Sequence, residues 1–277
     1  MTSPRILAGL THAEYTALPG ISASTLRALR QSPLHCRHHL DASDSDTTSR
    51  GWLRAIHALV LEPHTWDRAF AVFEGARRAG HGWEAWRAGQ MDRTILLASE
   101  AASARAVASA VLTHPVAGPM LTGPHGASEV SVTWTDPATG LDCRGRLDRL
   151  QRQAGGGWLV ADLKTIDSTA DHRVRQLVGQ HGWHVQLAHY MAAIEAARPA
   201  DAVAGALVTV ESGPPHDVAV WTLGDAELEI ARAERAELLA LYRRCSESGR
   251  WPGRYELAQP LTLPPYCYPD LEDVSDV

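Results

Sequence analysis

Three apolar runs near the middle of the chain predict neighbouring β-strands. In the first, Val130, Val132 and Trp134 alternate with polar residues, the second alternates less strictly, and the third is more continuously apolar. The three runs cover residues 129–134, 143–150 and 158–163. Turn-forming residues at 136–140 and 155–157 separate them. We therefore expect two successive hairpins, which form an antiparallel three-stranded meander.

Helical patterns lie on both sides of this meander. The predicted helices cover 22–40, 52–61, 92–112, a segment within 170–197, and 225–246, and two more strands cover 204–210 and 216–221. Ser22 or Ser24 is the expected N-cap of the first helix, which Pro33 interrupts, and residues 41–49 form a polar loop. This order predicts an α/β fold, with a mixed central β-sheet flanked by helices and a helical N-terminal region.

The 277 residues show no linker and no internal repeat, and at 45% hydrophobic they can bury one full core. We expect one domain over 1–277, with a mainly helical part at 1–115, an α/β core at 127–250 and a C-terminal tail at 251–277. No apolar run approaches the ~20 residues that span a bilayer, and the first residues lack an apolar signal core. The four cysteines are scattered without C-x-x-C spacing, which favours a reducing cytoplasm and argues against zinc or an iron–sulfur cluster.

Lys164 is the only lysine among 26 Lys and Arg residues. Lys is a compact charge on a flexible stem, and the planar guanidinium of Arg does not replace it. A single Lys in a chain that otherwise uses Arg therefore suggests a chemical role, although a solvated strand end is the alternative. Because no other Lys exists, a G-x-x-x-x-G-K-[ST] phosphate loop is excluded, and with it an ATP-driven helicase activity of this chain.

The meander brings carboxylates from distant positions toward this lysine. They belong to Glu129, Asp148 and Asp162. Carboxylates without nearby thiolates or paired histidines suit a hard cation such as Mg²⁺ or Mn²⁺. Lys164 would then orient the attacking water or stabilise charge that develops on phosphorus. The alternative is that these carboxylates form structural ion pairs with neighbouring arginines.

Asp148, followed by Asp162-Leu163-Lys164, resembles the signature of the PD-(D/E)xK nuclease superfamily. More of the chain resembles one branch, the RecE-like (exonuclease VIII-type) phage and prophage exodeoxyribonucleases. The further similar segments are 20–26 with 32–35, 55–63, 182–190, 251–253 and 261–265, so that the resemblance runs from about residue 10 to about residue 269. Two stretches depart from the family pattern. Residues 53–57 replace its Gly-x-Ala-x-His approach to the histidine, and the Gly-, Arg- and Trp-rich segment 75–89 is expected to be an altered loop.

The resemblance implies a restriction-endonuclease-like core and assigns roles to individual residues. The implied metal ligands are Asp148, Asp162, the Leu163 carbonyl and His57. Glu129 completes or flanks the site, Lys164 positions the water, and Gln186 and Tyr190, four apart on one helix face, contact DNA or brace the carboxylates. On the pattern alone, a single histidine on an apolar helix is more often a core or solvent-facing residue than a ligand, and this is the alternative for His57.

The net charge of −6 does not exclude DNA as a substrate, because a local patch binds phosphate. Arg144, Arg146, Arg149 and Arg152 follow one predicted strand, and we expect Arg144 and Arg146 to bind DNA or to support the site. The alternative is that these arginines pair with acidic neighbours.

These observations together predict a Mg²⁺- or Mn²⁺-dependent hydrolase that cleaves DNA phosphodiester bonds. By resemblance, it is a 5′–3′ exonuclease acting on double-stranded DNA ends in phage-type recombination, assembled as a homo-oligomeric ring and working beside a single-strand annealing protein. A PD-(D/E)xK endonuclease and a nuclease-fold protein that binds DNA or a partner without cutting are the alternatives. The complete set of Glu129, Asp148, Asp162 and Lys164 argues against the last of these.

Overall fold

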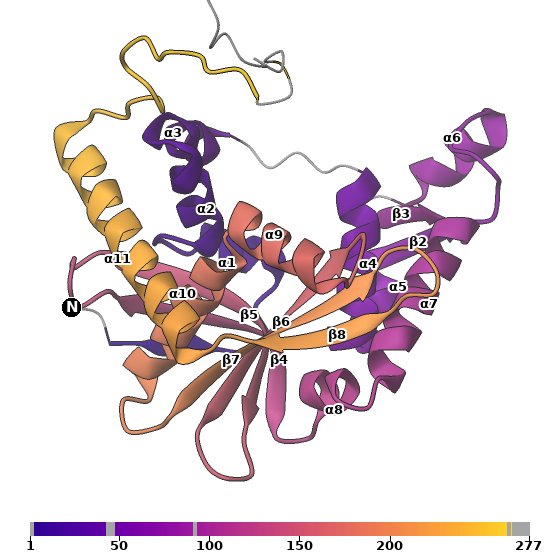
Figure 1. The fold of residues 1–277 in the computed structure, drawn as a ribbon. Coiled ribbons are helices and arrows are strands. Elements are labelled where there is room, and N and C mark those ends of the chain that lie inside the picture. Colours follow the sequence, from indigo (N-terminus) through magenta and orange to yellow (C-terminus); the bar gives the residue numbers. More distant parts are fainter. Residues whose placement is uncertain (1–2, 43–47, 91–92, 265–266, 268–277) are drawn as a thin grey trace, which may run out of the picture.

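The computed structural model describes residues 3–42, 48–90, 93–264 and 267. Its centre is a six-stranded sheet in the order β1-β4-β5-β6-β7-β8 (Figure 1). The strands are β1 (Arg5–Leu7), β4 (Gly126–Thr135), β5 (Asp142–Arg152), β6 (Trp158–Ile166), β7 (Val203–Glu211) and β8 (Val218–Thr222). Only β6 and β7 are parallel, and the other neighbours are antiparallel. The predicted meander and the mixed α/β sheet are confirmed.

Helices cover both faces of this sheet. One apolar cluster packs α2 (Ala23–Gln31), α10 (Trp183–Ala197) and α11 (Asp225–Ser248) against β4 and β5. A second cluster packs α4 (Thr48–Leu61), α7 (Ala98–Thr113) and α8 (Ala117–Thr122) against β6 and β7. The remaining elements are α1 (His12–Ala17), α3 (Pro33–Asp41), a 3₁₀ turn at Pro63–Thr65, α5 (Trp66–Ala69), α6 (His81–Ala88) and α9 (Asp171–His181).

Several predicted element boundaries are confirmed by the backbone. Ser22 caps α2 by accepting from the N–H of Thr25, and Ser32 ends α2 and caps α3, so that the break falls beside Pro33 as expected. The predicted segment 170–197 is two helices, because Gly182 adopts φ +68° between α9 and α10. Of the loop expected at 41–49, residues 43–47 lie outside the described part of the chain, and α4 begins within it at Thr48.

Two predictions in the N-terminal part are wrong. The helix expected at 92–112 begins only at Ala98, because Thr94–Leu97 forms β3, which pairs in parallel with β2 (Phe70–Phe73). Glu100 accepts from the N–H of Leu97, and this contact starts α7 after the strand. The segment 75–89 is not a loop throughout, because residues 81–88 form α6, whose Trp83 packs edge-on against Phe73 at 5.2 Å between ring centroids.

Strands β5 and β6 pair along only part of their length. Their register covers Arg149–Arg152 opposite Trp158–Ala161. Beyond these residues β5 continues beside β4, and β6 continues beside β7 as far as Ile166. The sheet therefore forks between β5 and β6, and we call this opening the fork.

Candidate active site

Two of the predicted acidic residues lie at the fork, where β5 and β6 stop pairing with each other. Asp148 and Asp162 are the first residues beyond the paired stretch on β5 and on β6. The backbone N–H of Leu163 donates to Oδ2 of Asp148 at 2.7 Å, so that a carboxylate takes over the hydrogen bonding that strand pairing provides further along. Two carboxylates from different strands are thereby held side by side.

Asp148 lies in an unusually negative environment. Burial first, and then the carboxylates of Asp162 and Glu129, raise its pKa well above the usual range, against the opposing influence of Lys164. The Nδ1 atom of His57, from α4, lies 3.7 Å from Oδ2 of Asp148. Burial is also the main cause of a lowered pKa of His57, which keeps the imidazole neutral and its lone pair available. The site therefore combines clustered negative charge with a neutral imidazole, and a bound cation would relieve the repulsion that raises the pKa of Asp148.

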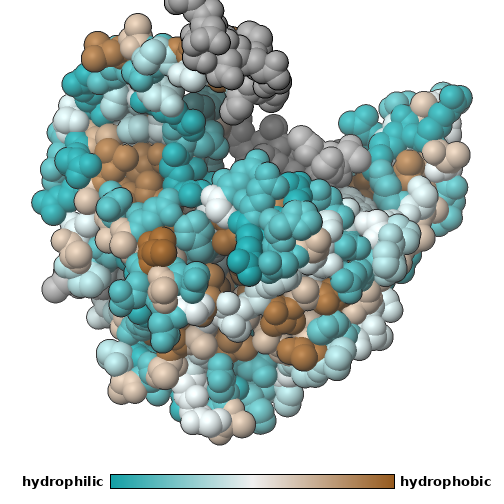
Figure 2. Space-filling model, viewed as in Figure 1, coloured by the Kyte–Doolittle hydropathy of each residue, from teal (hydrophilic) through white to brown (hydrophobic). Residues whose placement is uncertain are grey.

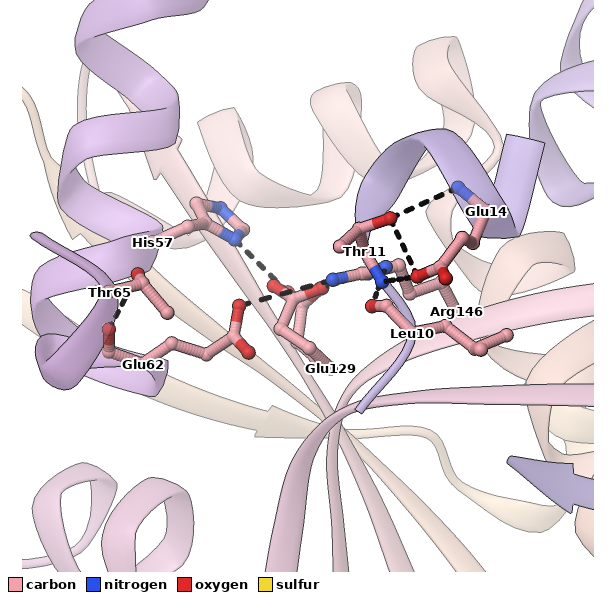
Figure 3. A network of polar contacts seen from close by, with 9 residues as sticks. Leu10, Thr11, Glu14, His57, Glu62, Thr65, Glu129 and Arg146 are labelled. Carbon is pink, nitrogen blue, oxygen red and sulfur yellow. Dashed lines mark hydrogen bonds and ion pairs between the residues drawn. The ribbon is translucent and has the colours of Figure 1, made fainter. Parts of the chain in front are cut away.

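Glu129 reaches the same place from β4 through an exceptional backbone. Its neighbours Ser128 and Val130 pair with Arg149 and Leu147 of β5 in one continuous register. Glu129 therefore lies opposite Asp148. Its φ is +51°, a left-handed conformation that costs a residue with a side chain of the order of 1–3 kcal/mol. Strain of this kind is concentrated at functional sites. Figure 3 shows His57 and Glu129 pointing into a shared space.

Arg146 neutralises part of this acidic cluster. Its Nε pairs with Glu129, and its Nη2 lies 3.9 Å from Oε2 of Glu62, at the end of α4 (Figure 3). Its Nη1 donates to the Leu10 carbonyl at 3.0 Å. Its side chain is only 13% exposed, and all three contacts are within the chain. We expected Arg146 either to bind DNA or to support the site, and these contacts fit the supporting role.

Asp162 and Lys164 form the other half of the site. Asp162 is 1% exposed, and its Oδ2 lies 2.6 Å from the Nζ of Lys164. Gln186 donates to Oδ1 of Asp162 at 2.9 Å, and its amide also lies 3.0 Å from the hydroxyl of Tyr190. The ring centroid of Trp183 lies 5.8 Å from Nζ. Gln186 and Tyr190 therefore brace a carboxylate, which is one of the two roles implied for them.

The residues fit a divalent cation. One ligand atom from each of His57, Glu129 and Asp148 can be chosen so that all three lie within 4.8 Å of one another. Ligands of one Mg²⁺ stand about 3 to 4 Å apart, since each bond is about 2.1 Å, so small side-chain movements would complete the set. Of the predicted ligands, His57 and Asp148 belong to this group, whereas Asp162 contacts Lys164 and Gln186. The backbone of Leu163 adjoins the group, because it hydrogen-bonds both His57 and Asp148. An imidazole among carboxylates suits Mn²⁺ as well as Mg²⁺.

The other arginines of β5 are engaged within the chain. Arg144 donates to the carbonyls of Tyr15, Thr16 and Leu18. Arg149 is buried and contacts Gly123 and Ser128, and Arg152 pairs with Asp201 at 3.1 Å. Within the described chain, only Arg152 of these three pairs with an acidic residue, as the alternative interpretation expected, whereas Arg144 and Arg149 are held by backbone carbonyls and a hydroxyl group.

Two residues of the site were not predicted from the sequence. Glu62 follows His57 by five residues at the end of the same helix, and burial together with Glu129 raises its pKa. Trp183 comes directly after the helix break at Gly182. The short distance in sequence between Glu62 and His57 could have indicated that Glu62 lies near the site. No sequence pattern indicated that Trp183 lies near Lys164.

The fork with its acidic pair and lysine defines a PD-(D/E)xK-type fold and site. A family model described as a PDDEXK-like domain of unknown function (DUF3799) matches residues 22–263. The chain belongs to this family. No curated protein matches its sequence.

One solved structure supports the fold. The chain resembles a crystal structure from Eubacterium rectale named "Putative exonuclease", with a TM-score of 0.63 and 12% identity, over 92% of this chain and 96% of that one. A second structure, of a protein named SSO0001, has 13% identity over 79% of this chain and 86% of that one. Its TM-score of 0.30 is too low to indicate a shared fold. Within the described residues, no helix is long and apolar enough to cross a membrane.

Proposed function

We propose that this protein is a metal-dependent deoxyribonuclease that hydrolyses DNA phosphodiester bonds. The observation that carries the proposal is the fork, where two strands place Asp148 and Asp162 together and Lys164 is held against the second. The family match and the fold of the Eubacterium rectale protein support a nuclease. In its specific form, the proposal is a RecE-like 5′–3′ exonuclease on duplex ends, acting in the cytoplasm in phage-type recombination as a single domain over 1–277.

The chain's own residues divide the work of hydrolysis. Asp148, Glu129 and His57 would hold Mg²⁺ or Mn²⁺, with Asp162 and the Leu163 backbone beside them. A bound divalent cation supplies a lowered pKa of water and neutralises charge on the phosphate. Hydrolyses this slow require on the order of 20 kcal/mol of barrier lowering, more than a single ammonium group supplies.

Lys164 is the positioning group for the attacking water. Asp162 fixes its ammonium from one side, and the chain from Tyr190 through Gln186 fixes Asp162 in turn. An ammonium so placed can donate a hydrogen bond to the water oxygen while that oxygen gives up a proton to solvent and bonds to phosphorus. The bond from phosphorus to one ester oxygen then breaks, and that oxygen leaves with a proton from solvent. The ammonium also stabilises the negative charge on the phosphate oxygens.

A comparison of linear and covalently closed circular duplex DNA tests the specific form. An end-dependent exonuclease degrades only the linear form, releases label from 5′ ends first, and elutes as a trimer or tetramer by light scattering, as expected for a closed ring. A monomer that nicks the closed circle would instead identify an endonuclease with the same metal site. A protein that binds both forms and cuts neither in Mg²⁺ or Mn²⁺ would refute the nuclease proposal.

A further inference from the structure

Two pockets share His181 in their linings, and the first of them also includes the end of β6. The first, the inner pocket, has a volume of about 710 Å³ and is lined by Trp52 of α4, Ser99 of α7, Thr165 of β6, and His181 and Trp183 among others. The second, the basic pocket, has a volume of about 500 Å³ and is lined by Arg27, Arg30, Gln31, Gln180, His181 and Arg254. In Figure 1, α9 lies between α2 and α4.

The basic pocket contains positive charge that the protein leaves available. No carboxylate is among the described residues that line it. Arg27 is exposed and makes no hydrogen bond or ion pair within the described chain, and Arg254 uses only its Nε, on the Gln31 carbonyl. Arg30 differs, because Glu234 pairs with it at 2.5 Å. Two guanidinium groups are therefore free to bind an anion.

The inner pocket connects this charge to the active site. Its lining includes Trp183, whose ring centroid lies 5.8 Å from Nζ of Lys164. Trp183, which faces the Lys164 ammonium, is stacked on the ring of His181 with centroids 5.5 Å apart and planes at 23°. Trp183 is 8% exposed and His181 is half-buried, so that His181 presents the accessible side of the stacked pair.

Electrostatics support the same path. Burial, followed by Arg27, Arg173 and Lys164, lowers the pKa of His181, which places that ring in the positive field of both ends of the path. The acidic residues of the inner pocket are already compensated, because Glu100 pairs with Arg78 and Asp167 with Arg173. Figure 2 shows hydrophilic side chains over α9.

We infer that this path, from Lys164 across His181 to Arg27 and Arg254, binds a single-stranded segment of the DNA that is being cut. The inference rests on the proposed function and names the subsite beside its active centre. Proteins bind single strands by combining a positive groove for phosphates with aromatic faces for bases. Here the His181 face takes a base, and the two arginines take phosphates beyond it.

Binding of a fluorescein-labelled 12-nucleotide oligothymidylate, followed by anisotropy in Ca²⁺, tests the inference without any need for cleavage. We expect Arg27→Ala/Arg254→Ala to weaken binding at least tenfold at low salt. The slope of log K against log salt should fall by about 1.4, because each lost phosphate contact on a single strand contributes about 0.7. His181→Ala should weaken binding of the same probe severalfold with an unchanged salt slope, since it removes stacking and not charge.

The matched control is Arg232→Ala/Arg243→Ala, which removes the same charge from the exposed face of α11, where both arginines are paired with glutamates. It should bind as the wild type does. Arg27→Ala alone, in which an exposed side chain without described contacts is removed, guards against misfolding of the double variant and should show part of its loss.

Equal affinity and salt slope in the double variant and the wild type would overturn the inference, as would a wild type that does not bind the oligonucleotide at low salt. The proposed function fails separately, when the wild type cleaves no DNA in Mg²⁺ or Mn²⁺. A protein that cuts duplex DNA while the double variant keeps full oligonucleotide affinity would therefore retain the function and lose this subsite.

Discussion

Replacing Asp148 with Asn should stabilise the protein when no metal is present. Oxygens of Asp148 and Glu129 lie within 4.8 Å of each other. At an effective dielectric constant of about 20, two such charges repel by about 3.5 kcal/mol, and Lys164 offsets part of this. Asn keeps the shape, and its carbonyl oxygen still accepts from the N–H of Leu163. We expect the free energy of unfolding to rise by about 1–3 kcal/mol at pH 8, which corresponds to about 2–5 °C in Tm for a chain of this length.

The pH dependence of this effect has a defined sign. The pKa of Asp148 is raised in the folded state, so the unfolded state loses its proton first as the pH rises. Wild-type stability is therefore intact below the unfolded pKa of about 3.9 and declines from there until the folded pKa is passed. Asp148→Asn lacks this decline, so that its advantage should be largest at pH 8 and should vanish near pH 4.

Urea unfolding in EDTA, followed by tryptophan fluorescence at several pH values, measures the difference. Asp201→Asn is the control, because the hydrogen bond from Trp158 and the charge of Arg152 lower the pKa of that carboxylate, and its loss should not stabilise the protein at pH 8. Adding Mn²⁺ should reverse the order, since only the wild type keeps the full ligand set. An Asp148→Asn variant that is less stable than the wild type at pH 8 in EDTA would show that this carboxylate is structural and would refute the reasoning.

Three more predictions follow from the contacts around the fork. Gly145→Ala should lose about 1–3 kcal/mol of stability and most cleavage activity, because its Cβ would lie 3.0 Å from the ring of Tyr190; urea unfolding and a cleavage assay check this. Arg235→Met should cost about 3–5 kcal/mol in urea unfolding, because it leaves the buried carboxylate of Asp136, 2.9 Å away, unpaired, and a neutral result would contradict it. His57→Asn should weaken Mn²⁺ binding at least tenfold by calorimetry. Wild-type affinity should fall as the pH is lowered, because Asp148, whose pKa is raised, takes up a proton in competition with the metal before His57 does.

The parts of the fold that were predicted correctly depend on local patterns. Alternating apolar residues defined β4 and β5, and Gly-rich turns separated β5 from β6, so that their antiparallel order followed from the chain alone. The spacing of Gln186 and Tyr190 predicted a shared helix face, and the structure brings the two side chains within hydrogen-bonding distance.

The parts that were missed depend on long-range geometry. The fork exists because pairing of β5 and β6 stops at Arg149 and Ala161, and no local pattern records where pairing ends. The left-handed backbone of Glu129 is likewise set by its neighbours in the sheet, since nothing in the residue type favours it. Strand β3 was mistaken for the start of a helix because its parallel partner lies more than twenty residues earlier in the chain.

The role of the β5 arginines shows the same limit. Their spacing along one strand was compatible with a phosphate-binding face. In the structure, however, Arg144 donates hydrogen bonds to backbone carbonyls of the N-terminal segment, more than one hundred residues away in the sequence. The available positive charge lies instead in Arg27 and Arg254, which are far apart in sequence and form no motif.

Cleavage of linear duplex DNA by the wild type and by Lys164→Arg, each in Mn²⁺, Mg²⁺ and EDTA, tests the central claim most directly. We expect degradation by the wild type with either metal, none in EDTA, and none by Lys164→Arg, because a guanidinium does not occupy the place of the ammonium between Asp162 and Trp183. Calorimetry should show that this variant still binds Mn²⁺, since Lys164 is not a ligand. Cleavage by the wild type in EDTA, or near-normal cleavage by Lys164→Arg, would contradict the account.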